Sequence, residues 1–527
     1  MDREEATDVQ HRARAIAKLR GELTKDISRA QAVARTCGLW ELLRLCYLLR
    51  LTHIFLIVPE FAEKLTPADL VELQLRDDAL KYAIGLVAKH GVWANQATAI
   101  SSLRAFDNQR VEVLERFARH INAKFETESV LEVAKVRVSG ERDQDCHIDL
   151  RAGLRDPQRS LYFHYGMRME RSTSRMKTDI LATPDLVRRL NEDFVEVAEM
   201  FEARCGISLD RFCKGILELD AALTTRFRAA EASSDVSETG RINPDGIRTF
   251  VGMSRAIYFT DAELEDALSP EFVCYLRAHP FDASAASETE LRFHYLTRRP
   301  FLMGQGFAVV SPDLFFDSVL ENIHFTLLEG DKSKAQYMDA GASRFLDRVA
   351  ALAARSGYEE LTRDVYLTQK KNNIGDIDLV LHNPVTGHTL LVEGKNHALP
   401  LRVYFRSPEA IDEHVARTRD WEMKVKRRIA HLHSPSPSYK IYGPWDYIVV
   451  SRMPEPLAHL SDLLVLSLDE FEQWLLQEPR PTSFARFYKD VYKPETPTMS
   501  IDEIRRLQEA GYVLGKPAGG SNSKRAF

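Results

Sequence analysis

The spacing of apolar residues changes along the chain and separates regions of different expected structure. From about residue 5 to 125, apolar residues recur every three or four positions, as at Leu42, Leu45 and Leu49, which predicts helices. From about 130 to 180 the pattern is mixed, with strand-like LEVAKVRV and LYFHYGM, before a helical pattern returns in PDLVRRLNEDFVEVAEMFEARCG. The first part of the chain is therefore expected to be mainly helical, with some strands.

The pattern is clearest in the last third of the chain. There, ASRFLDRVAALAARSG predicts a helix ended by Gly357, and three strand candidates follow it, RDVYLTQ, DIDLVLH and HTLLVEGK. Asn383, Pro384 and Gly387 indicate a turn between the last two. A helix over about residues 408–432, the strands WDYIVVSR and DLLVLSL and the helix DEFEQWLL complete the order α-β-β-β-α-β-β-α. This order predicts an α/β fold with a C-terminal mixed sheet flanked by helices.

Polar stretches mark the expected limits of four regions. We expect a helical region at 1–125, a mixed α+β region at 126–335 that is either separate from the first or continuous with it, the α/β domain at 336–478, and an extension at 479–527. The limit near residue 335 rests on the polar stretch LEGDKSKAQYMDAG. In the extension, Ser500 and Glu503 form a capping-box pattern, which predicts a short helix before a disordered tail.

Composition narrows the class of protein. The formal net charge of −6 and the 44% hydrophobic content fit an ordinary globular protein, so any basic surface must be local. The six cysteines are scattered without metal-ligand spacing, which favours reduced, buried thiols in a cytoplasmic protein. The charged N-terminus predicts no signal peptide, and the apolar stretch near residue 45 carries Glu41, Arg44 and Arg50. These charges favour a core helix, and we expect no membrane partner.

Two neighbouring strand candidates carry charges where a buried strand ordinarily carries none. Because strand side chains alternate between faces, Asp376 and Asp378 share a face, and so do Glu393 and Lys395. If the strands pair, these side chains converge. Clustered carboxylates repel one another unless a cation neutralises them, and their oxygens suit Mg²⁺ or Mn²⁺. A lysine beside such an ion can steady an attacking water or neutralise charge that develops on a phosphate.

Asp378 followed by Glu393-Gly394-Lys395 on these elements resembles the PD-(D/E)xK nucleases of the restriction-endonuclease-like superfamily. The resemblance covers about residues 341–476 and includes the order of elements. It implies a restriction-endonuclease-like core in which Asp378 and Glu393 bind Mg²⁺ and Lys395 assists phosphodiester hydrolysis. It also implies that the backbone carbonyl of Gly394 reaches the metal.

The sequence departs from the family pattern in two places. The proline of the family motif is absent, and Gly-Asp-Ile-Asp resembles a Gly-Glu-Ile-Asp variant in which the later acid is the ligand, so we rank Asp378 above Asp376. The upstream acid of many members is left open among Asp347, Glu359 and Glu360.

Glu-x-Lys by itself is a weak string. It recurs at Glu422 and Lys424 in the predicted long helix, where residues two apart diverge and do not form the same site. If the two strands formed a surface hairpin, each of the charges at Asp376, Asp378, Glu393 and Lys395 could be an ordinary solvated side chain. That interpretation does not explain why the acids and the lysine occur together in this order.

Basic residues on the predicted long helix offer a surface for phosphates. At helical spacing they fall on one side, apart from the apolar face, and they are Arg417, Lys424, Arg427 and Arg428. A solvated helix face explains them equally well. Asn396, His397 and Arg402 follow the acidic strand and are candidates to touch substrate, although His397 can equally cap a loop.

Together these observations predict a Mg²⁺-dependent endonuclease acting on nucleic acid, with DNA as the first choice of substrate. Restriction or antiviral defence follows from the family resemblance alone. The N-terminal region is too long for a linker, which suggests substrate recognition, homo-oligomerisation or a partner protein. The alternative is a nuclease-like protein that no longer cuts and serves in nucleic-acid binding or as a scaffold.

Overall fold

The structure is a computed structural model, which describes residues 3–492 except for short segments. The excepted residues are 58–63, 66, 98–102, 104–105, 140–146, 155–160, 179–181, 237–241, 293–294, 317–318, 320–322, 324–325, 328–330, 370–371, 398 and 405. The helix expected near Ser500 and the tail after it lie outside the described residues.

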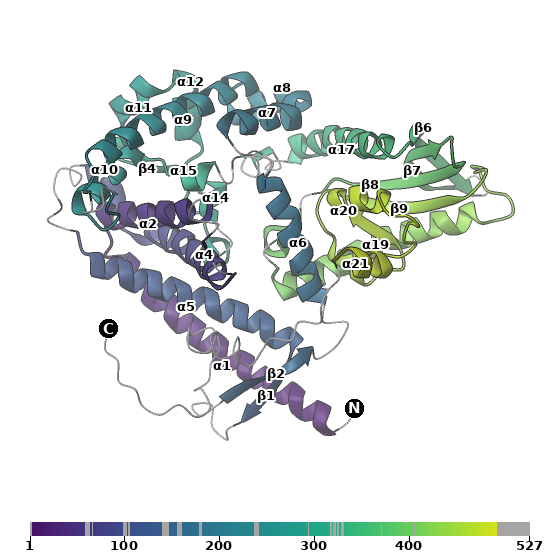
Figure 1. Ribbon diagram of the computed structural model, residues 1–527, viewed down its shortest axis with the longest axis horizontal. Coiled ribbons are helices and arrows are strands. Elements are labelled where there is room, and N and C mark those ends of the chain that lie inside the picture. Colours follow the sequence, from purple (N-terminus) through teal and green to yellow (C-terminus); the bar gives the residue numbers. More distant parts are fainter. Residues whose placement is uncertain are drawn as a thin grey trace.

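The first part of the chain is mainly helical, as predicted, and lies beside the C-terminal sheet (Figure 1). Its first elements are α1 (Arg3–Ala34), α2 (Leu39–Ile57), α4 (Pro67–His90), η1 (Trp93–Asn95), α5 (Asn108–Val133), β1 (Ala134–Ser139), β2 (His147–Leu154) and α6 (Leu161–Thr178). The next are α7 (Thr183–Phe194), η4 (Val195–Val197), α8 (Ala198–Cys205), α9 (Leu209–Ala232), α10 (Ile247–Ile257), β3 (Tyr258–Thr260), α11 (Asp261–Ala267), α12 (Pro270–Ala278), α13 (Glu288–Arg292), α14 (Tyr295–Arg298), β4 (Leu302–Gly304), β5 (Phe307–Val309) and α15 (Pro312–Phe315).

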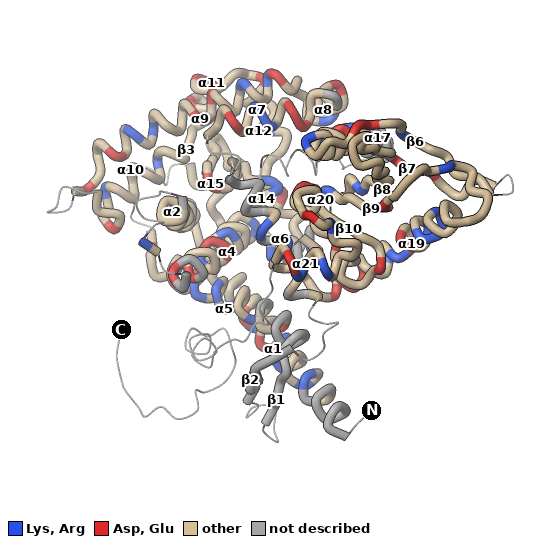
Figure 2. Tube along the Cα trace, turned by 45° about the vertical axis from the view of Figure 1, so that its right-hand side comes forward, with Lys and Arg blue, Asp and Glu red and all other residues tan. Residues whose placement is uncertain are grey.

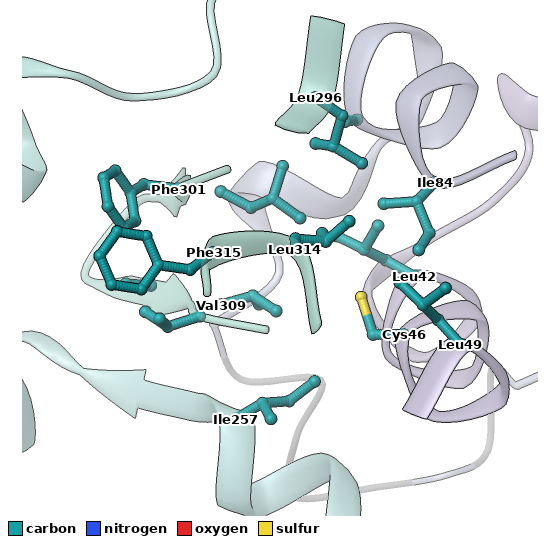
Figure 3. Packing of buried hydrophobic residues seen from close by; sticks show 14 of the residues in the cluster. Leu42, Cys46, Leu49, Ile84, Ile257, Leu296, Phe301, Val309, Leu314 and Phe315 are labelled. Carbon is teal, nitrogen blue, oxygen red and sulfur yellow. The ribbon is translucent and has the colours of Figure 1, made fainter. Parts of the chain in front are cut away.

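One hydrophobic core joins the two regions expected at 1–125 and 126–335. Figure 3 shows Leu42 of α2 and Ile84 of α4 in the same cluster as Val309 of β5 and Phe315 of α15. These residues are all fully buried or nearly so. Described residues of the two regions therefore share one core.

The composition predicted that no helix spans a membrane and that the cysteines are buried thiols. Among the described residues, none of the helices combines the length and apolar content that a membrane crossing requires. The described cysteines are free thiols, of which Cys37, Cys46, Cys205 and Cys213 are buried as expected. Cys274 is exposed on α12, so the expectation of burial is wrong there.

The expectation of a strand at LYFHYGM is wrong, because this segment begins α6. Leu161, Tyr165 and Met169 recur every four positions and are buried together with Val403 and Ile411 of the C-terminal part. This period fits a helix, whereas the aromatic content of the segment favoured a strand. LEVAKVRV is divided between the end of α5 and β1, which pairs antiparallel with β2.

The C-terminal part is the predicted α/β unit, with a mixed sheet in the order β10-β9-β8-β7-β6. Strands β6, β7 and β8 pair antiparallel, and β8, β9 and β10 pair parallel. Its elements are α17 (Asp331–Ala354), β6 (Glu359–Gln369), β7 (Asn372–Asn383), β8 (His388–Lys395), α18 (Leu401–Tyr404), α19 (Pro408–Leu432), β9 (Trp445–Ser451), η5 (Pro456–His459), β10 (Leu464–Ser467), α20 (Leu468–Leu475) and α21 (Phe484–Tyr492).

Three details of this part differ from the prediction. Helix α17 begins at Asp331, so the polar stretch that suggested a limit near residue 335 is mostly helical. The short helix α18 and the helix α21 have no counterpart in the predicted order. The remaining predicted helices and strands are confirmed, and the turn between β7 and β8 contains Gly387 with φ of 67°.

Candidate functional site

The acidic residues lie where β7 and β8 separate. The last residues that pair between these strands are Leu379, which follows Asp378, and Val392, which precedes Glu393. Beyond this point β7 continues only beside β6, and β8 continues beside β9, where Glu393 is opposite Val449. The carboxylate of Asp378 spans the opening, because its Oδ2 accepts a hydrogen bond of 2.7 Å from the backbone N–H of Gly394.

Glu393 is a buried carboxylate held by two cations and a phenol. Its side chain is 4% exposed, and the ammonium of Lys395 donates to Oε1 at 2.6 Å. The guanidinium of Arg428 and the hydroxyl of Tyr447, the latter at 3.3 Å, donate to Oε2. Both carboxylate oxygens therefore have charged partners, which a buried carboxylate needs.

The pKa of Asp378 reflects its burial and the charges around it. Burial raises the pKa of this carboxyl from 3.8 to about 6, and the charge of Glu393 is the next largest cause. Lys395 and the N–H of Gly394 act in the opposite direction, and Asp376 raises the pKa further. Asp378 is thus joined to the Glu393-Gly394-Lys395 segment through the N–H of Gly394, and Lys395 contacts Glu393 directly.

The two faces of the sheet are covered by different helices. A Cβ built on Gly394 would lie 2.7 Å from Leu346, on α17, so this residue is closed off by that helix. Its neighbour Glu393 points the other way and meets Arg428 of α19. The charged cluster consequently lies on the α19 face of the sheet, opposite α17.

A second glycine shapes the same cluster. Gly375 on β7 has φ of 119°, a conformation that L-residues with side chains rarely adopt. A Cβ at this position would collide with the guanidinium of Arg428. Gly375 thus leaves the space through which Arg428 reaches Glu393.

The expectation that four basic residues share one exposed side of α19 is wrong for Arg428. Its side chain is 8% exposed and faces Glu393, and the charge of Glu393 raises its pKa against the effect of burial. Arg417, Lys424 and Arg427 are exposed, and Figure 2 shows lysine and arginine positions along α19. Lys424 and Arg427 line a shallow hollow of about 300 Å³ together with Asp420 and Met423.

Three other acids that were candidates in the sequence, Glu422, Asp347 and Glu360, have partners of their own. Glu422, from the second Glu-x-Lys string, lies on α19 as predicted and accepts hydrogen bonds from Ser461 and Arg419. Asp347 forms an ion pair of 2.6 Å with Arg363, which also pairs with Glu360. These contacts hold α17 to β6 and leave the upstream acid of the family pattern without a clear counterpart.

Sequence analysis missed the roles of Arg428 and Tyr447. A signal for Arg428 was present, because it follows Val425 by three positions in the series of buried residues on α19. Tyr447 lies in an apolar strand, and no sequence pattern links it to Glu393. Asn396 donates to the carbonyl of Gly341 at 2.6 Å, a contact that ties the end of β8 to α17.

The fold and the site define an α/β protein with a mixed sheet and a buried carboxylate-lysine-arginine cluster at the point where two strands separate. No family model, curated protein or solved structure matches the chain. Its function is therefore inferred from this geometry and from the residues that form it.

Proposed function

We propose that the protein is a Mg²⁺-dependent nuclease that hydrolyses phosphodiester bonds, with DNA as the substrate. The observation that carries this proposal is the convergence of Asp378, Glu393 and Lys395 where β7 and β8 separate. Two carboxylates and a lysine in this arrangement are the groups that metal-assisted hydrolysis of a phosphodiester requires. The motif and the order of elements resemble the PD-(D/E)xK nucleases.

The residues fit a hard divalent cation. The oxygens of Asp378 and Glu393 are suitable ligands for Mg²⁺ or Mn²⁺, with the carbonyl of Gly394 as a third candidate. Burial, and next to it the charge of Glu393, raise the pKa of Asp378, so a second negative charge beside Glu393 is unfavourable in the protein alone. A cation bound between the two carboxylates removes this repulsion, so binding and deprotonation of Asp378 favour each other.

Lys395 is the group that must move. Its ammonium holds Oε1 of Glu393, and its side chain is 22% exposed, so it has access to solvent. The bound ion would supply an activated water and polarise the scissile phosphate. Once released from Glu393, Lys395 would be able to donate to a phosphate oxygen and to stabilise the charge that develops there. Arg428 and Tyr447 are positioning residues, because they keep Oε2 of Glu393 fixed.

Nucleic acid would be held by Arg417, Lys424 and Arg427, which are exposed on α19. The biological setting that we propose, a cytoplasmic role in restriction or antiviral defence, rests on the family resemblance alone. The helical N-terminal region would then serve in recognition of substrate, in homo-oligomerisation or in contact with a partner protein.

A second candidate function is favoured by the ion pairs of Glu393, whose two carboxylate oxygens are both bound by basic side chains. Lys395 and Arg428 neutralise this carboxylate without any ion, so the cluster is also stable as a structural element. In that case the protein binds nucleic acid or serves as a scaffold and does not cut.

The test is a cleavage assay with Mg²⁺ on supercoiled plasmid, linear duplex, single-stranded DNA and RNA. We expect cleavage by the wild type, a loss of at least about 100-fold in Asp378→Asn and Lys395→Ala, and no change in Lys440→Ala, an exposed lysine used as control. Unchanged cleavage in both site variants contradicts the proposal. Absence of cleavage on every substrate, together with binding that Lys424→Ala weakens, supports the second candidate.

A further inference from the structure

Two histidines and a glutamate from three separate segments meet at a second place in the C-terminal part. His397 lies just after β8, His414 lies on α19, and Glu455 precedes the short helix η5. Nε2 of His397 is 2.6 Å from Oε1 of Glu455, and Nε2 of His414 is 2.9 Å from Oε2. One ligand atom from each residue lies within 4.8 Å of the other two. Among the described residues, this is where three or more His, Cys, Asp or Glu side chains are spaced closely enough to share an ion.

The geometry at His397 differs from that at His414. The contact from His414 to Glu455 is a buried hydrogen bond, whereas Nε2 of His397 is close to Oε1 but not aligned for one. This nitrogen is therefore buried without a hydrogen-bond partner, although it faces a carboxylate. In the tautomer that has its proton on Nδ1, Nε2 of His397 can instead act as a ligand for an ion that it shares with Glu455.

Buried hydrophobic side chains flank two of the three residues. His414 lies between Ile411 and Val415, and Glu455 lies between Met453 and Leu457, four members of one buried hydrophobic cluster. Arg168 of α6 donates to the backbone carbonyl of Glu455 at 2.8 Å, which fixes this residue from another part of the chain.

We propose that His397, His414 and Glu455 bind a transition-metal ion of the Zn²⁺ type. Two imidazoles and one carboxylate are a donor set that suits Zn²⁺ and does not suit Mg²⁺, so this site differs in chemistry from the Asp378–Glu393 pair. Around an ion with bonds of about 2.1 Å the ligand atoms would lie roughly 3.4 Å apart, which requires shifts below about 1 Å. Three protein ligands leave one position for water, and His397 is the ligand nearest to solvent.

The consequence for the fold is a link between the end of β8, α19 and the segment after β9. His397 follows Lys395 by two residues, so an ion bound here fixes the chain directly beyond the first site. This inference does not depend on nuclease activity, because a bound ion would stabilise the same segments in a scaffold protein.

The test is titration of the metal-free full-length protein with Co²⁺, whose visible absorption is intense in four-coordinate nitrogen and oxygen sites. We expect one equivalent to produce this band in the wild type, and Zn²⁺ to abolish it. Glu455→Gln keeps the size of the side chain and the contact from Arg168 to its backbone. We expect it to weaken Co²⁺ binding by more than about tenfold.

Two further variants separate loss of the site from loss of folding. His397→Gln leaves the hydrogen bond between His414 and Glu455 intact, so it should fold and lose the band. Asp378→Asn and His433→Gln, an exposed histidine used as control, should keep the band with unchanged affinity. Absence of the band in the wild type, or its persistence with unchanged affinity in Glu455→Gln and His397→Gln, overturns the proposal.

Discussion

Glu393 is a carboxylate in the interior of the protein, and its energetics depend on the two cations that contact it. Removing a partner from a buried ion pair leaves an uncompensated charge, which costs far more than a surface ion pair contributes. The sequence predicted Lys395 as one partner, because residues two apart on a strand share a face. It did not predict Arg428 as the other, because the contact joins residues of different elements that only the packing of α19 on β7 brings together.

We expect Arg428→Ala to lower the free energy of unfolding by about 3–5 kcal/mol, because Glu393 would stay buried after losing one of its two cationic partners. The matched control is Arg427→Ala, which removes an exposed neighbour that donates to the carbonyl of Ile374. It should cost about 1 kcal/mol. Denaturation with urea measures both values, and equal costs for the two variants would contradict the described burial of Arg428.

Asp378 gives the metal-free protein a pH dependence of known sign. Its pKa is raised by burial and by Glu393 to about 6, so between pH 3.8 and 6 the folded state holds more protons than the unfolded state. The stability that this group contributes is thus fully present below the pKa of the unfolded state, 3.8, and is lost as the pH rises through the pKa of the folded state, about 6. In EDTA at pH 8, we expect Asp378→Asn to be more stable than the wild type by an amount on the order of 1–2 kcal/mol.

Melting temperatures between pH 4 and pH 8 test this expectation. The advantage of Asp378→Asn should shrink toward pH 4, and an excess of Mg²⁺ should stabilise the wild type more than the variant at pH 8. A wild type that is the more stable of the two at pH 8 in EDTA would contradict the raised pKa of Asp378.

At the level of elements, the sequence predicted the parts that have a strong period and clear turn residues. β6, β7 and β8, the turn before β8, and the whole of α19 follow from apolar periodicity. The N-terminal turns of α17 were missed because their residues are polar, and the start of α6 was missed because its aromatic residues favour strands. The separation of β7 from β8 at Asp378 was not predictable, because pairing beyond Leu379 depends on what each strand meets on its other side.

The element-scale prediction concerns Gly375, whose φ of 119° and contact with Arg428 both exclude a side chain. We expect Gly375→Ala to cost about 2–4 kcal/mol, since backbone strain adds to the collision with Arg428. Gly387→Ala is the control, because Gly387 also has positive φ but has open space around its Cα. Its cost should be limited to strain of about 1 kcal/mol. Equal effects in thermal unfolding would show that the contact with Arg428 is unimportant.

For the whole molecule, α6 comes from the N-terminal part of the sequence but packs on the C-terminal part. Arg168 on α6 is fully buried, and its guanidinium donates to both oxygens of Glu470 at 2.6 and 2.7 Å. Glu470 also caps α20, so the pair joins residues that lie about 300 positions apart in the chain. Sequence analysis placed these residues in different regions, and no local pattern could connect them.

We expect Arg168→Ala to destabilise the C-terminal part by about 3–5 kcal/mol, because Glu470 would stay buried without its partner. Arg188→Ala on α7, which removes exposed ion pairs, should cost less than about 1 kcal/mol. Hydrogen exchange of amides in β9 and β10 reports on the affected part. Protection in these strands that equals the wild type in both variants would contradict the role of α6.

The central claim is that Asp378 and Glu393 together hold one divalent cation. Anomalous diffraction from crystals soaked with Mn²⁺ measures this directly. We predict a peak at about 2.1–2.3 Å from an oxygen of each carboxylate, with the ammonium of Lys395 displaced from Oε1 of Glu393. No peak between the two carboxylates at saturating Mn²⁺, with Lys395 still bound to Glu393, would contradict the account.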